Sequence, residues 1–413
     1  MNEIIVRLPL VFSWAMRPFQ IVLSRFKGVG INDLLIRAVA ITLLALLFGG
    51  RSVSKFQLFG PIYIVDFLFL LITAITLVKS RFKFVWPIYF NTFVIVFIIF
   101  LSSFFRSDAP IDIIIRQFVL FIYAFSSYVV VGYLTSVNKK DDLKNLLVGL
   151  AAFSVVSQTF YLVFLLVSGK FVFGGFNYLS PVVVCGVIIW VCYLFSERKL
   201  SLSVLPSWLF ALFLSFSFGH SSAVMAVGLI PFFYILLNTE LKYRIYSLGL
   251  ILILLGMFFY IFPQIIDDNA SWRLVYWNIA LNNIFSGMNW LFGFGFGQLY
   301  ADEAARYIFL EIFGSSNDLQ FENEGYYKAF HNSYITIFFH IGLLSIVFYI
   351  TQIKAIFAKR SFYNNKENTF LGLSALGLAV WAYFNVVLEL PHSAHYYWLV
   401  IFMCYHSQKR NGL

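Results

Sequence analysis

The chain is built from apolar runs of about twenty residues that follow one another at short intervals, the length a helix needs to cross a bilayer. Helices are the only open-ended elements that satisfy their own backbone hydrogen bonds in lipid. The pattern therefore predicts an all-α, polytopic integral membrane protein with about twelve transmembrane helices. We expect these spans at residues 33–49, 57–78, 85–104, 112–134, 145–168, 177–195, 203–218, 221–238, 245–263, 332–353, 369–388 and 395–407.

The composition agrees with a membrane location. Only 12% of the 413 residues are charged and 61% are hydrophobic, whereas soluble domains carry about 25% charged residues. The three cysteines all fall inside apolar runs, so the sequence indicates neither a disulfide framework nor a cysteine and histidine metal site. We expect no metal and no cofactor.

Basic residues alternate between successive loops. The N-terminal segment and every second loop hold 20 of the 29 lysines and arginines, and the opposite loops hold 8. The positive-inside rule then places both termini in the cytoplasm. This topology accounts for the net charge of +10, so we expect no nucleic-acid partner.

One loop is far longer than the others. Residues 264–331 separate the ninth and tenth spans on the outer side and carry eight acidic residues against three basic ones. Long ordered loops on a compact bundle commonly carry function. We divide the chain into a cytoplasmic amphipathic segment (1–32), spans one to nine (33–263), the large periplasmic loop (264–331), and spans ten to twelve with the cytoplasmic C-terminus (332–413).

The large loop contains two local patterns. The stretch SWRLVYWNIALNNIF, residues 271–285, predicts an amphipathic helix at the membrane interface. Its aromatic residues Trp272, Tyr276 and Trp277 suit the lipid headgroup region. The sequence GFGFG at 293–297 predicts a flexible turn.

Three charged residues are expected at membrane depth, where charge is costly. Arg37 lies near the cytoplasmic start of the first span, where its side chain can reach the interface. Asp66 falls in the second span and either forms a structural pair with a basic residue of a neighbouring helix or has a functional role. Arg116 follows Asp112 by one helical turn. It either pairs with that residue or faces an outer cavity and binds an anion.

Histidines gather at the outer ends of the spans. His220, His331, His392 and His395 are expected at this level, where Arg273, Arg116 and Glu389 complete a cluster. Histidine can act as a general base near neutral pH, and arginine binds phosphate through its planar fork. These residue types suit transfer from a lipid diphosphate, with arginine stabilising the leaving group. The alternative is an ordinary helix start capped by Asn332.

Two motifs carry a resemblance to a known family. His331-Asn332 is followed by nine residues and Gly342. Arg273, Trp277 and Ala280 lead to the glycine-rich turn at 293–297. In this order, on this topology, they resemble the O-antigen polymerase/ligase superfamily of bacterial envelope glycan assembly, over residues 205–400.

The resemblance implies a metal-independent glycosyltransferase with a GT-C-like fold in the bacterial cytoplasmic (inner) membrane. Its donor would be an undecaprenyl-diphosphate-linked oligosaccharide, used at the periplasmic face, with a chain-length regulator or lipid A–core as further partners. His331 takes the position of the catalytic histidine and Arg273 that of the diphosphate-binding arginine. The expected substrate-binding set is completed by Arg116, His220, Glu389 and Asn332.

Two departures from the family pattern bear on the reaction. Members often carry Ser-Arg-Gly-Ala where this chain has His220-Ser221-Ser222-Ala223, so the charge of the arginine is either absent here or supplied by His220 or Arg116. Ser345 departs from the ligase form of the signature. Both favour a polymerase of lipid-linked repeat units over a ligase to lipid A–core. A glycolipid transporter is less favoured, because the sequence shows no internal repeat.

Overall fold

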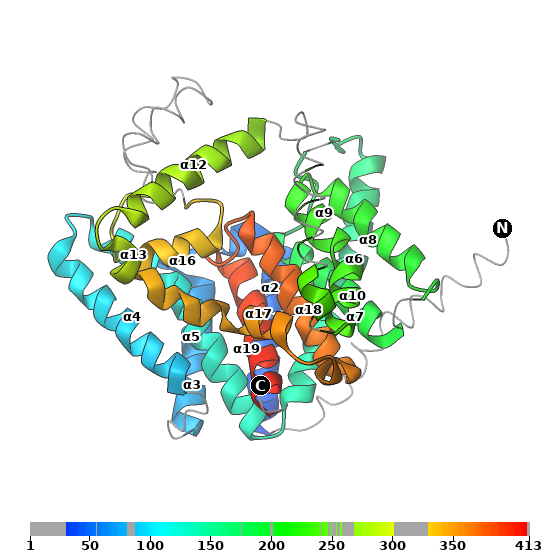
Figure 1. The fold of residues 1–413 in the computed structure, drawn as a ribbon, viewed down its shortest axis with the longest axis horizontal. Helices are drawn as coiled ribbons and strands as arrows, with labels where there is room; N and C mark the ends of the chain where they lie inside the picture. Colours follow the sequence, from blue (N-terminus) through cyan, green and yellow to red (C-terminus); the bar gives the residue numbers. More distant parts are fainter. Residues whose placement is uncertain are drawn as a thin grey trace.

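The computed structural model describes residues 30–246, 268–300 and 329–410, apart from residues 55, 81–86, 174, 199–200 and 241, and it also describes Gly249, Ile253 and Met257. The described chain is almost entirely helical (Figure 1). Its first half contains α2 (Ile31–Ser54), β1 (Gln57–Phe59), β2 (Ile62–Tyr63), α3 (Ile64–Ser80), α4 (Pro87–Arg106), α5 (Ile111–Ser136), α6 (Lys140–Val167) and α7 (Pro181–Arg198). Its second half contains α8 (Leu205–Ser217), α9 (Ser221–Gly228), α10 (Ile230–Asn238), α12 (Asp268–Phe285), α13 (Asn289–Phe292), α16 (Ser333–Ile341), η3 (Gly342–Ser345), α17 (Ile346–Phe357), η4 (Arg360–Asn364), α18 (Lys366–Tyr383) and α19 (Pro391–Arg410).

Seven segments of the described chain are long and apolar enough to cross a membrane. They are Asn32–Gly50, Ile88–Arg106, Ile111–Ser136, Lys140–Val167, Pro181–Arg198, Ser221–Asn238 and Ser333–Phe357. The prediction of a helical, polytopic membrane protein is confirmed in this coarse form. The count of twelve spans stays a prediction, because most of the span expected at 245–263 and the whole segment 1–29 lie outside the described residues.

Some predicted boundaries were wrong. The second span was expected from residue 57, but residues 57–63 form a two-stranded antiparallel hairpin and α3 begins at Ile64. The turn of this hairpin contains Gly60 with a φ of 53°, a conformation that glycine adopts at little cost. The last helix, expected at 395–407, is 20 residues long and starts at Pro391.

The core lies around α7, α18 and α19. Helix α7 packs against α6 and α18, and α19 packs against α5 and α18. Because protein surrounds α19, this helix can hold buried polar residues such as His395 and Gln408. The peripheral helix α4 instead exposes large apolar side chains such as Ile98 and Phe105, as expected for a lipid-facing helix.

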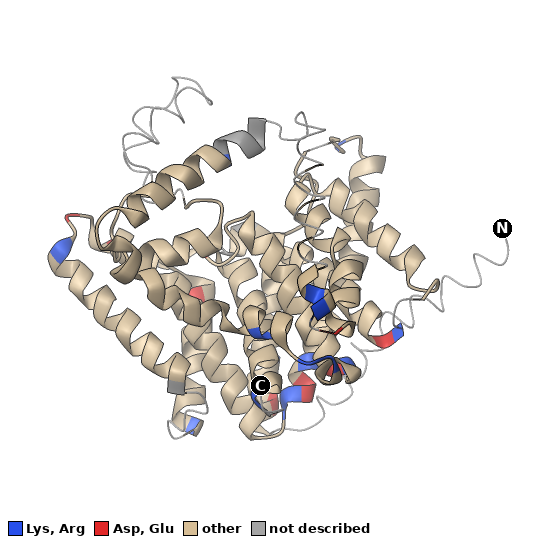
Figure 2. Cartoon of the chain, in the orientation of Figure 1, with Lys and Arg blue, Asp and Glu red and all other residues tan. Residues whose placement is uncertain are grey.

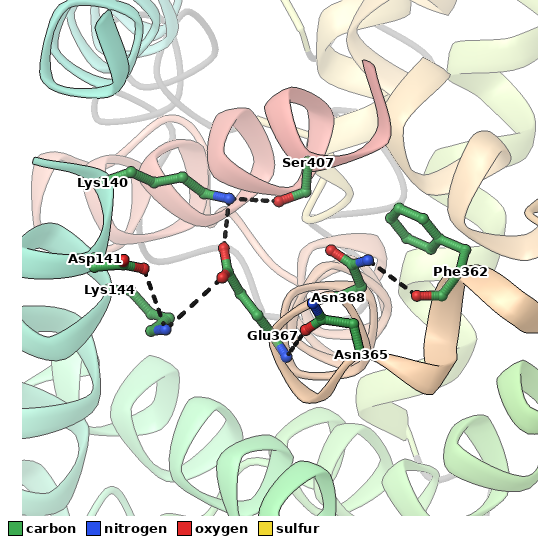
Figure 3. A network of polar contacts seen from close by, with 8 residues as sticks. All are labelled: Lys140, Asp141, Lys144, Phe362, Asn365, Glu367, Asn368 and Ser407. Carbon is green, nitrogen blue, oxygen red and sulfur yellow. Dashed lines mark hydrogen bonds and ion pairs between the residues drawn. The ribbon is translucent and has the colours of Figure 1, made fainter. Parts of the chain in front are cut away.

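Charged residues gather around the end of the bundle where α19 ends (Figure 2). There Lys140 pairs with Glu367 and contacts the hydroxyl of Ser407 at 2.5 Å, and Lys144 lies 3.9 Å from the same glutamate (Figure 3). This network joins the starts of α6 and α18 to the end of α19. These three helix ends therefore meet in one charged region, and the topology expected from the loop charges stays a prediction.

Candidate functional site

His331 lies immediately before α16 in a strained backbone conformation. Its φ is 51°, and Asn138 is the only other described residue besides glycines with a positive φ. The left-handed region costs a residue with a Cβ about 1–3 kcal/mol, and such strain persists only where the surroundings impose it. The backbone N–H of His331 donates to the carbonyl oxygen of Ala329 at 2.8 Å, which closes a tight turn.

Asn332 begins the helix that follows. Its side-chain oxygen accepts hydrogen bonds from the backbone N–H groups of Tyr334 and Ile335, at 3.0 and 3.1 Å. The residue is fully buried. The interpretation of Asn332 as a helix cap is confirmed, so its oxygen serves α16 and is not available to a substrate.

Helix α12 holds the segment before His331. The indole Nε1 of Trp277 donates a hydrogen bond of 2.6 Å to the carbonyl oxygen of Phe330, and the ring of Tyr276 packs on the Phe330 ring. The helix expected at 271–285 is confirmed. The expectation that Tyr276 and Trp277 lie among lipid headgroups was wrong, because both are buried against Phe330.

Arg273 and His220 both act electrostatically on the His331 imidazole. Burial, and then the interactions with Arg273 and His220, lower the pKa of His331 from its ordinary 6.5 to about 4. Arg273 precedes Trp277 by one helical turn, so the anchored helix α12 places this arginine on the His331 side. The structure thus brings together the histidine, the arginine and His220, as the sequence predicted.

His220 enters this group from another part of the bundle. It precedes the first turn of α9, and its ring lies 5.0 Å from the Phe176 ring and 5.3 Å from the Tyr178 ring, measured between centroids. Two residues on, the hydroxyl of Ser222 accepts a hydrogen bond from the Asn385 side chain. This contact connects α9 to the loop between α18 and α19.

The glycine-rich turn at 293–297 was expected to be flexible, and this was wrong. Its N–H groups at Phe294 and Gly295 donate to the carbonyls of Phe339 and His340, at 2.8 and 3.0 Å. Gly342 follows the end of α16 at a φ of 55°, and a Cβ there would lie 2.6 Å from the carbonyl group of Leu291. The second motif therefore packs into the first, and only glycine permits the close approach.

A comparison with protein families covers this part of the chain. Residues 200–350, which run from α8 into α17, match a family model described as O-antigen ligase. This match supports the O-antigen polymerase/ligase superfamily, which the two sequence motifs resemble. The family implies a bacterial membrane enzyme that transfers glycans in O-antigen biosynthesis, in the context of a lipid-linked glycan. No match to a curated protein was found.

Glu389, which the sequence analysis placed in the substrate-binding set, lies in the loop before α19. Its carboxylate oxygen Oε2 lies 2.7 Å from the Ser333 hydroxyl, which also accepts a hydrogen bond from the backbone N–H of Val387 at 2.9 Å. Burial raises the pKa of Glu389, and the hydrogen bond from Ser333 opposes this rise. Glu389 thereby fastens its loop to the start of α16, directly beside His331.

Arg116 is committed to other protein groups. It pairs with Asp66 at 3.1 Å and not with Asp112, and it also donates to the Tyr123 hydroxyl and to the Glu389 carbonyl, each at 3.3 Å. The expected partner of Asp66 on a neighbouring helix is thus Arg116. We interpret Arg116 as a support for the Glu389 loop.

The sequence predicted that four outer histidines gather, and of these His220 acts electrostatically on His331. His395 is fully buried in α19, stacked on Phe69 and edge-on to Tyr123. His392 is also buried in the first turn of this helix. Of the expected site residues, Arg273 and His220 act electrostatically on His331.

Sequence reasoning missed two supporting residues of the superfamily site. Ser333 holds the Glu389 loop, and its place after Asn332 in the motif was the only local signal. The Tyr300 hydroxyl forms a hydrogen bond of 2.7 Å with the Nε2 atom of His340, and no local sequence pattern predicted this contact. Within the described ranges no group of three or more His, Cys, Asp or Glu could hold a metal ion.

Proposed function

We propose that this chain is a glycosyltransferase at the periplasmic face of the bacterial cytoplasmic membrane, with both termini in the cytoplasm. It polymerises O-antigen or related repeat units that are linked to undecaprenyl diphosphate. The observation that carries the proposal is the placement of His331 at the outer start of α16, within reach of the charges of Arg273 and His220, inside the matched segment.

The reaction assigns a separate role to each residue. The acceptor hydroxyl loses its proton to the neutral His331 imidazole as its oxygen bonds to the anomeric carbon of the donor. The bond from that carbon to the diphosphate oxygen breaks, and Arg273 stabilises the leaving diphosphate. Low pKa keeps His331 unprotonated before reaction, so it is ready to accept the proton. Direct displacement predicts inversion at the anomeric carbon.

The second candidate is a ligase that transfers the glycan to lipid A–core. The description of the matched family as O-antigen ligase supports it. The serine at position 221, where family members often have arginine, supports the polymerase. Ser221 is exposed and directly follows His220, a residue of the candidate site. Ser345 is buried within η3, so its departure concerns packing and bears little on the donor.

The test is a lipopolysaccharide gel on a strain that lacks the chain and is complemented with wild type, His331→Ala or Arg273→Ala. Membrane expression is measured in parallel. The matched controls are Arg106→Ala, on an exposed arginine at the outer end of α4, and His406→Ala, near the end of α19. We expect both site variants to lose the ladder and both controls to keep it.

Each pattern on the gel has a distinct meaning. Core carrying a single repeat unit in both site variants supports the polymerase. Bare core supports the ligase instead. An unchanged ladder from well-expressed site variants would overturn the assignment of His331 and Arg273, and the glycolipid transporter would become the leading candidate.

A further inference from the structure

The loop between α6 and α7 presents an apolar tip. Its side chains at Val172, Phe173 and Phe176 are 60%, 91% and 70% exposed. Clustered exposed apolar side chains on a protein surface commonly mark a binding site or a membrane contact. We call these three residues the apolar tip.

Internal hydrogen bonds hold the apolar tip in shape. The Asn177 side chain contacts both backbone groups of Val172 and the carbonyl oxygen of Gly175. The buried Gln158 side chain donates to the Asn177 carbonyl at 2.8 Å and accepts from the backbone N–H of Leu179 at 3.0 Å. The exposed rings therefore stand on a built turn, so their exposure is a stable feature of the surface.

The apolar tip lies between a lipid-facing helix and a residue of the candidate site. On one side it continues the exposed apolar face of α6, a candidate membrane span whose outer end exposes Phe164 and Val167. On the other side Phe176 packs against His220, whose charge reaches His331. The tip is thus an apolar path from the lipid-facing surface to the candidate site.

We propose that the apolar tip binds the polyprenyl chain of the lipid-linked donor and leads it from the bilayer to the site at His331. The inference rests on the proposed function. A donor whose diphosphate lies beside Arg273 and His220 must extend its hydrocarbon chain away from the site. The apolar tip is an exposed apolar surface in contact with His220, and phenylalanine and valine offer a hydrocarbon chain contact without a polar group.

Photocrosslinking tests the contact directly. The photoreactive residue benzoylphenylalanine replaces Phe173 in the full chain, reconstituted in phospholipid nanodiscs with radiolabelled undecaprenyl diphosphate. The matched control replaces Phe105, which is equally exposed at 91% but lies at the outer end of α4, on the far side of the bundle from α6 (Figure 1). We expect labelling at position 173 that excess unlabelled undecaprenyl diphosphate removes, and only phospholipid adducts at position 105.

Affinity measurements test the effect of chain length. We expect the double variant Phe173→Ser/Phe176→Ser to bind undecaprenyl diphosphate about tenfold more weakly than wild type, as expected when about 1.4 kcal/mol of apolar contact is lost. Its affinity for geranyl diphosphate, which has the same head group and a short chain, is expected to be unchanged. Phe105→Ser should alter neither affinity.

The outcomes separate this inference from the proposed function. If wild type binds both diphosphates and the double variant does so equally well, the apolar tip has no role and the proposed function still holds. Equal labelling at positions 173 and 105 would likewise reduce the tip to a contact with bulk lipid. If wild type binds neither diphosphate, the proposed donor is wrong, and the proposed role of the apolar tip is then wrong as well.

Discussion

The indole nitrogen of Trp277 lies 2.6 Å from the carbonyl oxygen of Phe330, the residue that precedes His331. This hydrogen bond links α12 to the one segment of the site whose backbone is strained. Because Arg273 lies one turn before Trp277 on α12, the same bond sets the position of the arginine relative to the histidine. Trp277 is therefore a positioning residue for both groups.

Replacing Trp277 by Phe tests this role, since the ring remains and the hydrogen bond is lost. The buried Phe330 carbonyl loses its partner and His331 can relax from its left-handed conformation. We expect kcat to fall about tenfold to a hundredfold, because misplacing a reacting group by about 1 Å costs that much. The KM for the donor should change little. Trp290→Phe is the control, on a half-exposed tryptophan of α13, and an unchanged kcat in Trp277→Phe would contradict the positioning role.

The pH dependence of kcat/KM should reflect the unusually low pKa of His331. The base must be neutral, and its pKa is lowered to about 4, so activity should persist well below the ordinary histidine pKa of 6.5. Removing a neighbouring positive charge raises the pKa of His331. The acid limb of the profile should therefore move to higher pH in Arg273→Gln and in His220→Gln, but not in Arg106→Gln. If the acid limb of both Arg273→Gln and His220→Gln lies at the same pH as in wild type, the assignment of His331 as the base is contradicted.

The same lowered pKa gives a stability change with a defined sign. Between pH 6.5 and about 4 the unfolded histidine binds a proton that the folded one does not. His331 therefore contributes stability above pH 6.5 that is lost as the pH falls toward 4. Thermal unfolding in detergent over this pH range should show a smaller loss in His331→Gln than in wild type. An equal loss in both would assign the effect to other groups.

Gly342→Ala should disrupt the packing of the glycine-rich turn at 293–297 against α16. The left-handed conformation costs alanine about 1–2 kcal/mol, and the new Cβ would also overlap the Leu291 carbonyl group. We expect a lower unfolding temperature together with lost activity. Gly132→Ala is the matched control, because a Cβ at this position of α5 meets nothing within 4 Å. Equal unfolding temperatures for the two variants would show that the packing of the turn against α16 is dispensable.

The ion pair of Arg116 and Asp66 should behave as a structural unit. Arg116→Gln leaves a buried carboxylate without its partner, which commonly costs about 3–5 kcal/mol. The double variant Asp66→Asn/Arg116→Gln removes both charges and should recover most of the unfolding temperature. Its KM for the donor should match that of wild type. A stable double variant with a strongly raised donor KM would instead return Arg116 to the diphosphate-binding set.

Local sequence patterns were sufficient to predict the helices and the residues at the centre of the candidate site. Apolar runs of span length predicted most of the described helices. The orientation expected from the alternation of basic loops stays a prediction. The motif at His331-Asn332 predicted a helix start after the large loop, and Asn332 caps α16. These features depend on neighbouring residues, which the sequence displays directly.

The sequence by itself determined a helical membrane protein with a histidine at the outer start of α16 and an arginine on a helix in the large loop. Only the tertiary structure decided how these groups are held. Trp277 and Phe330 are 53 residues apart and Arg116 and Asp66 are 50 apart, so no local period reports their contact. The strain at His331 and the burial of His395 depend on the packing of distant helices, because burial and backbone strain are set by whatever surrounds a residue in space.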